Sequence, residues 1–478
     1  MSSGETTSRL FRSSGAATFS QAWRSGVTLL VMILLRRLVA PENWGLYDWV
    51  LAVFLILGAV RDLGFVYHIV RLDKRPYGNL LAVEAGWGTL LTLGSIFGAP
   101  FIALFLREPH PDALAVIRAM SVFLLFEGLA SVPRVYFDCE LKVGRTLLPE
   151  IVRNLLFAAI SVYLAFLGFE VWAIVIAQIV GTIYYAVHLW VRAWPEMPLV
   201  YQKGMTLALV AASLPLASIW LLAILVQNVD PLILGRHVDA SAIGHYGFAY
   251  RFAFLVSAII VPAITRTVYP ALVAFRKDPS KMMEAYRLGT ILVLACEVPA
   301  AAFLFVNPQV LQIIGGGKWD DRVVLFVTIL AFAPLIDPFS RLGGEVLKTF
   351  HKDKTWILAT GITLASFAGF GWWFTTRFGA QGMAFANFLQ LGGLVMGWTL
   401  YRLAPAAFVR LARDLLFVYL VPIAPFAAAW WLGGEGFWLK AALSVVAAGL
   451  TVGVYWWRFG SAFREFFADR AAAAPSAP

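Results

Sequence analysis

The sequence predicts an all-α integral membrane protein with about fourteen transmembrane helices. Hydrophobic residues make up 60% of the chain, charged residues make up 14%, and the mean hydropathy is +0.77. A soluble domain is usually about half apolar and about a quarter charged. Apolar stretches of the length that a spanning helix needs, about 20 residues, follow one another with only short polar breaks. An outer-membrane barrel is excluded, because it requires short segments of alternating polarity.

Each predicted span is a predominantly apolar stretch bounded by charged, Gly-rich or Pro-containing segments. The third, seventh and eighth exceed the usual length, which indicates tilted helices or helix ends that project from the bilayer. In order, the predicted spans cover residues 17–39, 46–69, 80–106, 113–136, 147–167, 170–191, 206–233, 243–270, 286–306, 323–346, 355–375, 380–401, 412–432 and 436–457.

The distribution of Lys and Arg predicts the orientation. With the N-terminus in the cytoplasm, the cytoplasmic segments hold roughly three times as many Lys and Arg residues as the opposite segments. The even number of spans then places both termini in the cytoplasm. The net charge of +10 is explained by this topology and by contact with lipid headgroups, and not by nucleic-acid binding. Arg36 and Arg37, at the outer end of the first span, depart from the rule.

A weak internal repeat predicts two halves. Gly45 and Tyr47 at the start of the second span recur as Gly244 and Tyr246 at the start of the eighth. The two copies run in the same direction, so the repeat axis lies along the membrane normal, and paired halves around a cavity are typical of transporters. The sequence predicts an N-terminal six-helix lobe at residues 1–197 and a C-terminal six-helix lobe at residues 205–403. Two additional helices follow at residues 410–457. Residues 458–478 form a cytoplasmic tail, and its Ala/Pro-rich part after Phe467 is expected to be disordered.

Polar residues inside the spans predict a cationic cavity. Gln21 and Arg24 belong to a polar stripe on the first span, with spacings of three and four residues. A charged residue at mid-bilayer costs about 2.5–3.5 kcal/mol on insertion scales, so it normally faces a cavity or a partner. One guanidinium group can donate hydrogen bonds to two phosphate oxygens at once, and it keeps its positive charge at any working pH. The further candidates for substrate binding are Arg61, Arg153, Tyr250 and Arg251.

Two interpretations of these arginines stay open. Each can line the cavity, or it can reach a headgroup or pair with a nearby acid. The second interpretation is favoured for Arg61, which is near a span end. The cavity is favoured for Arg24, Arg153 and Arg251, because the adjacent sequence offers them no obvious acid partner.

Acidic residues in apolar sequence are candidates for ion coupling or gating. Asp337, Arg341 and Glu345 are spaced four apart, so Arg341 can bridge both acids, and a structural ladder is favoured over a transport role. Glu297 and Asp230 can carry a coupling proton or act as buried partners of an arginine, and the latter is favoured. The full set of coupling candidates is Asp62, Asp230, Glu297, Asp337 and Arg341.

The sequence contains no motif for an enzyme or a bound cofactor. It lacks the Gly-Lys-Ser/Thr phosphate loop and the Gly-x-Ser-x-Gly turn. His68, His188 and His245 lie near span ends, and no two of them share a metal-ligand spacing. We therefore expect neither catalysis nor a metal or other cofactor.

Several short motifs, in order, resemble bacterial polysaccharide flippases of the multidrug/oligosaccharidyl-lipid/polysaccharide exporter superfamily. The first is Gly45-Leu46-Tyr47 followed by Asp62-Leu63-Gly64 and Arg71. The later matches are Val132-Pro133, Leu141-Lys142, Leu164-Ala165-Phe166 with Gly168 and Trp172-Ala173, Asn228-Val229-Asp230 with Leu234-Gly235-Arg236, Gly244, Tyr246, Ala249-Tyr250, Pro270 and Gly315-Gly316-Gly317-Lys318-Trp319. The resemblance covers roughly residues 10–405.

The resemblance implies a function in polysaccharide assembly. Such a flippase moves an undecaprenyl-diphosphate-linked oligosaccharide from the cytoplasmic to the outer leaflet by alternating access, for O-antigen, capsule or exopolysaccharide. It implies two six-helix bundles in a V-shaped, pseudo-twofold arrangement with two additional C-terminal helices. Arg24, Arg61 and Arg251 fall in spans where related flippases place cavity arginines. The implied location is the bacterial inner membrane, with membrane lipids and other polysaccharide-assembly proteins as partners and no nucleic acid.

Three alternatives to the flippase differ from it in what they require of the sequence. An ion-coupled multidrug antiporter of the same fold needs acids in its cavity to bind cationic drugs, and the buried arginines argue against it. A polysaccharide polymerase or ligase needs a large outward loop, and the longest, near 307–322, is too small. A non-transporting membrane subunit of a polysaccharide synthase is compatible with the same motifs.

Overall fold

The computed structural model describes residues 30–62, 69, 75–142, 144–350 and 352–473. Every regular element in these ranges is a helix, which confirms the predicted all-α class. Eleven of the described helices are long and apolar enough to cross a membrane. Only 11% of the apolar window of Gly144–Phe166 is buried. Apolar helices with so little protein cover are suited to a lipid environment, where each helix satisfies its own backbone hydrogen bonds.

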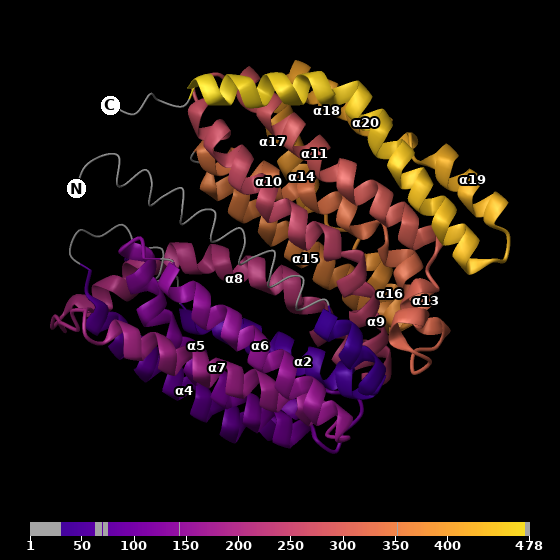
Figure 1. The fold of residues 1–478 in the computed structure, drawn as a ribbon. Coiled ribbons are helices and arrows are strands. Elements are labelled where there is room, and N and C mark those ends of the chain that lie inside the picture. The colour runs from indigo at the N-terminus through magenta and orange to yellow at the C-terminus, as the bar shows by residue number, and fades with distance from the viewer. Residues whose placement is uncertain (1–29, 63–68, 70–74, 143, 351, 474–478) are drawn as a thin grey trace. The chain divides into compact units, whose positions relative to one another are not determined.

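The chain divides into two compact units, residues 1–244 and 245–478. In the first unit α5 packs on α2, α4 and α7, α7 packs on α6, and α2 packs on α8 (Figure 1). The predicted seventh span, which is α8, therefore packs with the helices of the N-terminal half. The helices of this unit are α2 (Pro41–Asp62), α4 (Tyr77–Ala103), α5 (Ala113–Cys139), α6 (Gly144–Phe166), α7 (Val171–Ala193) and α8 (Met205–His237).

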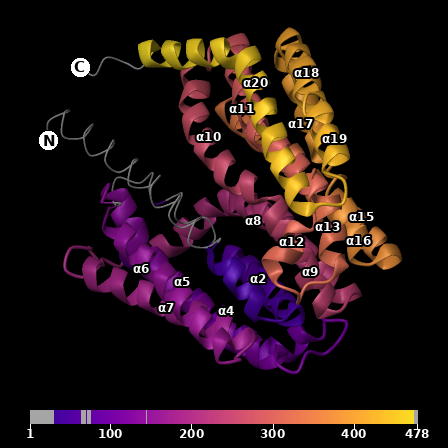
Figure 2. The same cartoon turned by 45° about the vertical axis from the view of Figure 1, so that its right-hand side comes forward.

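Helix α11 is the centre of the second unit, where it contacts α10, α14, α18 and α20 (Figure 2). Helix α9 (Ala240–Ala253) crosses the boundary between the units. Helix α20 continues to Ala473, past Phe467, where we expected disorder to begin. The other helices are α10 (Leu255–Ala274), α11 (Pro279–Val306), α12 (Val310–Gly315), α13 (Asp321–Leu330), η1 (Ala333–Ile336), α14 (Asp337–Thr349), α15 (Asp353–Phe378), α16 (Ala380–Ala386), α17 (Gly392–Leu403), α18 (Pro405–Leu420), α19 (Ile423–Gly433) and α20 (Phe437–Ala473).

Four predicted spans are broken helices in the structure. The eighth span, expected to be one long helix, is divided at Phe254 into α9 and α10. The tenth consists of α13, η1 and α14, with Pro334 and Pro338 near the junction, where proline lacks the N–H that a continuous helix needs. The twelfth is divided into α16 and α17. The thirteenth is divided into α18 and α19, with Pro422 at the junction. Irregular backbone at membrane depth requires cover by protein or a polar cavity, so the breaks mark places where function can reside.

The recurring glycines Gly45 and Gly244 contact each other's helices. A Cβ on Gly45 would lie 1.7 Å from the Ala240 carbonyl oxygen, and one on Gly244 would lie 2.0 Å from the Pro41 oxygen. Each glycine thus faces the residue four positions before the other glycine. Such reciprocal contacts arise across a local two-fold axis. The repeat seen in the sequence is therefore a place where the starts of α2 and α9 touch backbone to backbone.

Arg36, which departs from the charge rule, stabilises this junction. Its side chain is fully buried, and its guanidinium lies 3.9 Å from the Trp44 ring centroid. One guanidinium nitrogen is 3.6 Å from an Asp48 carboxylate oxygen, and another donates to the Gly244 carbonyl oxygen at 3.4 Å. A guanidinium can satisfy several partners at once because it has five donors in a fixed geometry. Arg36 has a structural role at this position.

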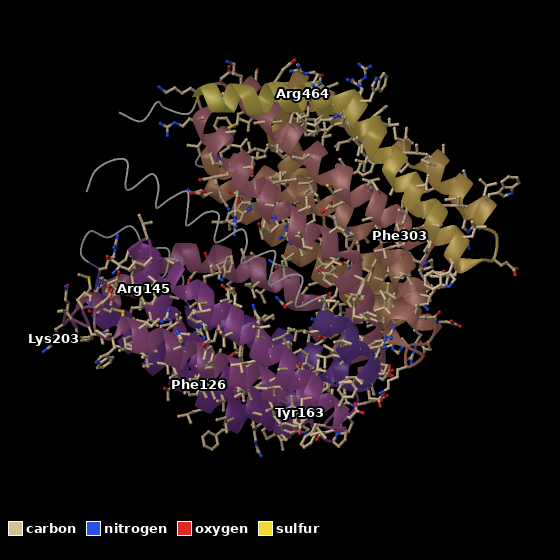
Figure 3. The ribbon with its side chains drawn as sticks, viewed as in Figure 1. Phe126, Arg145, Tyr163, Lys203, Phe303 and Arg464 are labelled. Atoms are coloured by element: carbon tan, nitrogen blue, oxygen red, sulfur yellow. The ribbon has the colours of Figure 1, made fainter. Side chains whose placement is uncertain are left out.

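Basic residues gather at one end of the first unit. Figure 3 shows Arg145 and Lys203 at the same end and Tyr163 at the opposite end. Beyond the end of α7, Glu196 accepts from Lys142 at 2.8 Å and from Arg145 at 2.5 Å. These two hydrogen bonds lower the pKa of Glu196 to about 2 from an ordinary 4.5. Glu196 thereby attaches the segment after α7 to the turn between α5 and α6.

We expect Glu196→Gln to increase hydrogen exchange in residues 194–204, after correction for intrinsic rates. The effect should be small because the pair is exposed and screened by water. A depressed pKa adds stability above the ordinary value that is lost as the pH falls. Protection in the native chain should therefore be constant at neutral pH and decrease between about pH 4.5 and about pH 2. Glu435→Gln is the matched control. Equal pH profiles in native and Glu196→Gln chains would contradict the assignment.

Candidate functional site

The first predicted site residues, Gln21 and Arg24, lie outside the described residues, as do Leu63, Gly64 and Arg71 of the sequence motif. Of the remaining substrate-binding candidates, Arg61 and Arg153 form ion pairs and Tyr250 stacks on aromatic rings.

Arg61 forms a closed, buried ion pair. Its Nε lies 3.1 Å from Oε2 of Glu84 on α4, and its Nη1 donates to the Leu124 carbonyl oxygen on α5 at 2.8 Å. Arg61 is 5% exposed and Glu84 is 1% exposed. A Cβ on Gly128 of α5 would lie 3.0 Å from both partners, so this glycine provides the space for the pair. Arg61 therefore joins α2, α4 and α5 and has an acid partner, the interpretation favoured for it from sequence.

Arg153 is also paired, although the sequence indicated a cavity residue without an acid. Its Nη1 lies 3.2 Å from Oε2 of Glu127 on α5, and its guanidinium lies 5.3 Å from the Tyr185 ring centroid. The sequence did not indicate this pair because the acid comes from a neighbouring helix. About a fifth of each side chain in this pair is exposed, at 21% and 23%. Arg153 is thus a paired arginine whose side chain is only partly covered by protein.

Acids accompany the cluster of arginines formed by Arg61, Arg134 and Arg153 among the residues described. Asp62 lies within electrostatic range of Arg61 and of Arg134 on α5. The three arginines are accompanied by at least four acids, at positions 62, 84, 127 and 138. The excess of cations that the sequence suggested is not present in this part of the first unit.

In the second unit, Tyr250 stands beside the break between α9 and α10. Its ring stacks on Phe254 at 4.3 Å and on Tyr246 at 6.0 Å between centroids. The Tyr246 hydroxyl accepts from Asn387 Nδ2 at 3.0 Å. Arg251 on the same helix is half-buried and makes interactions of its own. Tyr250 also lies within electrostatic range of Arg341.

Asp337 and Arg341 pair at the start of α14. Arg341 Nε lies 2.6 Å from Asp337 Oδ2, and Ser257 Oγ on α10 donates to the same carboxylate at 3.5 Å. Glu345 pairs instead with Lys348, at 2.9 Å, so the predicted ladder in which Arg341 bridges both acids is wrong. The reason is that Lys348, one turn further on, satisfies Glu345 and leaves Arg341 to Asp337.

The two isolated acids belong to different units. Asp230 on α8 is 3% exposed and takes part in interactions within the structure. Glu297 on α11 is 2% exposed and lies within electrostatic range of Asp337 and Arg341. In the described ranges no group of three or more His, Cys, Asp and Glu side chains could hold a metal ion.

Sequence reasoning did not select Glu84, Glu127 or Ser257 as site residues. Each contacts a candidate from a different helix, so no helical spacing connects it to its partner. The only sequence signal was that Glu84 and Glu127 are acids inside apolar stretches.

The apolar helices, the broken spans and the charged residues between them define a multi-pass membrane protein of the transporter class. Residues 34–324 match the family model described as polysaccharide biosynthesis protein, and the chain belongs to this family. It is 22% identical over 411 residues to the teichuronic acid biosynthesis protein TuaB of Bacillus subtilis, covering 82% of this chain and 83% of that one. It is 21% identical over 315 residues to the succinoglycan biosynthesis transport protein ExoT of Rhizobium meliloti, covering 64% and 63%.

The fold is that of a known flippase. The structure of the lipid II flippase MurJ, in an inward closed conformation, superimposes with a TM-score of 0.73 at 14% sequence identity, covering 94% of this chain and 99% of that chain. The predicted fold class and the predicted polysaccharide family are thus confirmed.

Proposed function

We propose that the chain flips a lipid-linked oligosaccharide, held through a diphosphate, from the cytoplasmic to the outer leaflet for polysaccharide assembly. The observation that carries the proposal is membership of the polysaccharide biosynthesis family over residues 34–324. Two similar proteins support the proposal. ExoT is described as a succinoglycan biosynthesis transport protein, and MurJ, which has the same fold, is described as a lipid II flippase. The chain acts as a transporter and not as an enzyme.

The proposed location and partners follow from this function. The chain is a multi-pass protein of the bacterial inner membrane with both termini in the cytoplasm, which the distribution of Lys and Arg supports. Its substrate is the diphosphate-linked oligosaccharide, and its other partners are membrane lipids and polysaccharide-assembly proteins. In this proposal the lobes at residues 1–197 and 205–403 rock against each other, and residues 410–457 form two additional helices.

Among the described arginines, Arg153 is the one proposed to bind phosphate directly. It is partly exposed, whereas Arg61 is enclosed by Glu84 and the α5 backbone and positions its helices. A phosphate that reaches Arg153 competes with the Glu127 carboxylate for the same guanidinium. Because a phosphate offers more acceptor oxygens and more charge, it can displace the carboxylate. Gln21, Arg24, Tyr250 and Arg251 complete the proposed binding set.

Substitutions of the Arg153–Glu127 pair test this site. Arg153→Ala should weaken binding of undecaprenyl diphosphate about tenfold to a hundredfold, because a charge-assisted hydrogen bond contributes about 1.5–3 kcal/mol. Glu127→Gln should strengthen binding, because it removes the internal competitor. Binding can be measured by titration of the purified chain, with the exposed Arg377→Ala as control. Weaker binding in Glu127→Gln would show that the acid does not compete with substrate.

The function can be tested in cells. Cells without the chain should lose the polysaccharide and accumulate its lipid-linked precursor in the cytoplasmic leaflet, and the native gene should restore the polymer. Accumulation of the precursor in the outer leaflet would overturn the proposal in favour of a synthase subunit. Normal polymer with increased sensitivity to cationic drugs would overturn it in favour of a multidrug antiporter.

A further inference from the structure

The Glu297 carboxylate is buried without a strong partner. The residue lies in the middle of α11, the central helix of the second unit, and is 2% exposed. Within the described residues, neither carboxylate oxygen forms a hydrogen bond of normal geometry. Burial of an ionised carboxylate that is neither paired nor hydrogen-bonded is prohibitively costly, and such a group becomes neutral instead.

The polar groups around Glu297 come from neighbouring helices and from α11 itself. Ser257 on α10 interacts with its carboxyl group, and Asp337 and Arg341 on α14 lie within electrostatic range. Tyr419 on α18 also lies within electrostatic range of Glu297, and the Tyr419 hydroxyl donates to the Leu335 carbonyl oxygen at 3.1 Å. Tyr455 on α20 lies near Tyr419, and the Tyr455 hydroxyl donates to the Val418 carbonyl oxygen. The thiol of Cys296, the residue before Glu297 on α11, lies within electrostatic range of Glu297.

The guanidinium of Arg341, which lies within electrostatic range of Glu297, already forms an ion pair. Arg341 is held by Asp337 at 2.6 Å. Asp337 adds a like charge near Glu297, which disfavours a second ionised carboxylate. A hard metal ion takes several oxygen ligands, and the described residues contain no group of three or more acids, histidines and cysteines that could hold one. A proton, in contrast, neutralises the carboxylate by binding to one of its oxygens and requires no other ligand.

We propose that Glu297 is the binding site of one exchangeable proton, bound in this conformation, and that its release moves Arg341 from Asp337 to Glu297. The proton passes from the carboxylic acid to water, and the carboxylate formed competes with Asp337 for the guanidinium. Both Asp337 and Arg341 belong to α14, which follows the break at η1, so this exchange changes contacts at a broken helix. The coupling step, though not the proton site itself, rests on the proposed transport function.

The site can be tested by infrared difference spectroscopy of the full chain in lipid nanodiscs. The native chain should show the C=O stretching band of a protonated carboxylic acid at neutral pH, and this band should disappear at alkaline pH. It should be absent from Glu297→Gln and unchanged in Glu345→Gln, whose carboxylate pairs with Lys348. Asp337→Asn, which frees Arg341 to pair with Glu297, should also remove the band at neutral pH.

Three outcomes would overturn the proton site. They are a native spectrum without the band, a band that persists in Glu297→Gln, and a band that disappears on addition of sodium at constant pH, which would indicate a cation site. Asp337→Asn gives an independent answer if Glu297→Gln does not fold. A second measurement addresses coupling: a proton gradient should accelerate flipping in the native chain and not in Glu297→Gln. The infrared measurement does not depend on transport. It therefore tests the proton site even if the flippase proposal fails.

Discussion

Gly45→Ala should strongly destabilise the folded chain. The added Cβ would lie 1.7 Å from the Ala240 carbonyl oxygen and 2.9 Å from the Gly244 nitrogen. Both are backbone atoms, so no side-chain rotation relieves the clash, and the starts of α2 and α9 must separate. Overpacking usually costs about 1–3 kcal/mol, and we expect the upper end or more. Size-exclusion chromatography and thermal unfolding of the purified chain measure the effect.

Gly86→Ala on α4 is the matched control. No heavy atom lies within 4 Å of a Cβ at Gly86, so the substitution should be neutral or slightly stabilising, because alanine favours a helix over glycine by about 1 kcal/mol. If Gly45→Ala and Gly86→Ala unfold at the same temperature, the helix starts are not in backbone contact.

The second large effect is expected for Glu84→Ala. Removal of one partner from a buried ion pair leaves an uncompensated charge and typically costs about 3–5 kcal/mol. Arg61 would keep its hydrogen bond to Leu124 but would lose its acid at 3.1 Å. The double substitution Arg61→Met with Glu84→Ala should recover much of the loss, because it leaves no buried charge.

Glu345→Ala is the comparison for Glu84→Ala, since its pair with Lys348 is partly exposed, at 21% and 37%. Exposed pairs contribute about 0–1 kcal/mol. Thermal unfolding should therefore separate the two substitutions clearly. A Glu84→Ala chain as stable as Glu345→Ala would mean that Arg61 does not need its acid partner.

The fold class could be predicted because the decisive property is local. A stretch of about 20 apolar residues is visible in the sequence without knowledge of its neighbours. Breaks within spans could not be predicted in the same way. Pro299 lies inside the continuous helix α11, whereas Pro334 and Pro338 stand at a break, so the effect of a proline depends on its tertiary surroundings.

The candidate site was less predictable because its partners are distant in sequence. The arginine at position 153 and the acid at position 127 are on different helices, and nothing in their spacing indicates that they meet. By contrast, Asp337 and Arg341 are one turn apart on one helix, and their pairing could be predicted. Gln21 and Arg24 stay predictions, as do the boundaries of the two six-helix lobes.

The central claim is that this chain moves a lipid-linked oligosaccharide between leaflets. The most direct measurement is the translocation of a fluorescent undecaprenyl-diphosphate oligosaccharide in proteoliposomes that contain only the purified chain. The account predicts transport by the native chain, faster than in protein-free vesicles, and loss of that transport in Arg24→Ala and Arg153→Ala. Transport that persists in both variants would keep the flippase and remove the arginine site. No transport by the native chain, with a folded protein and an accepted glycan, would contradict the central claim.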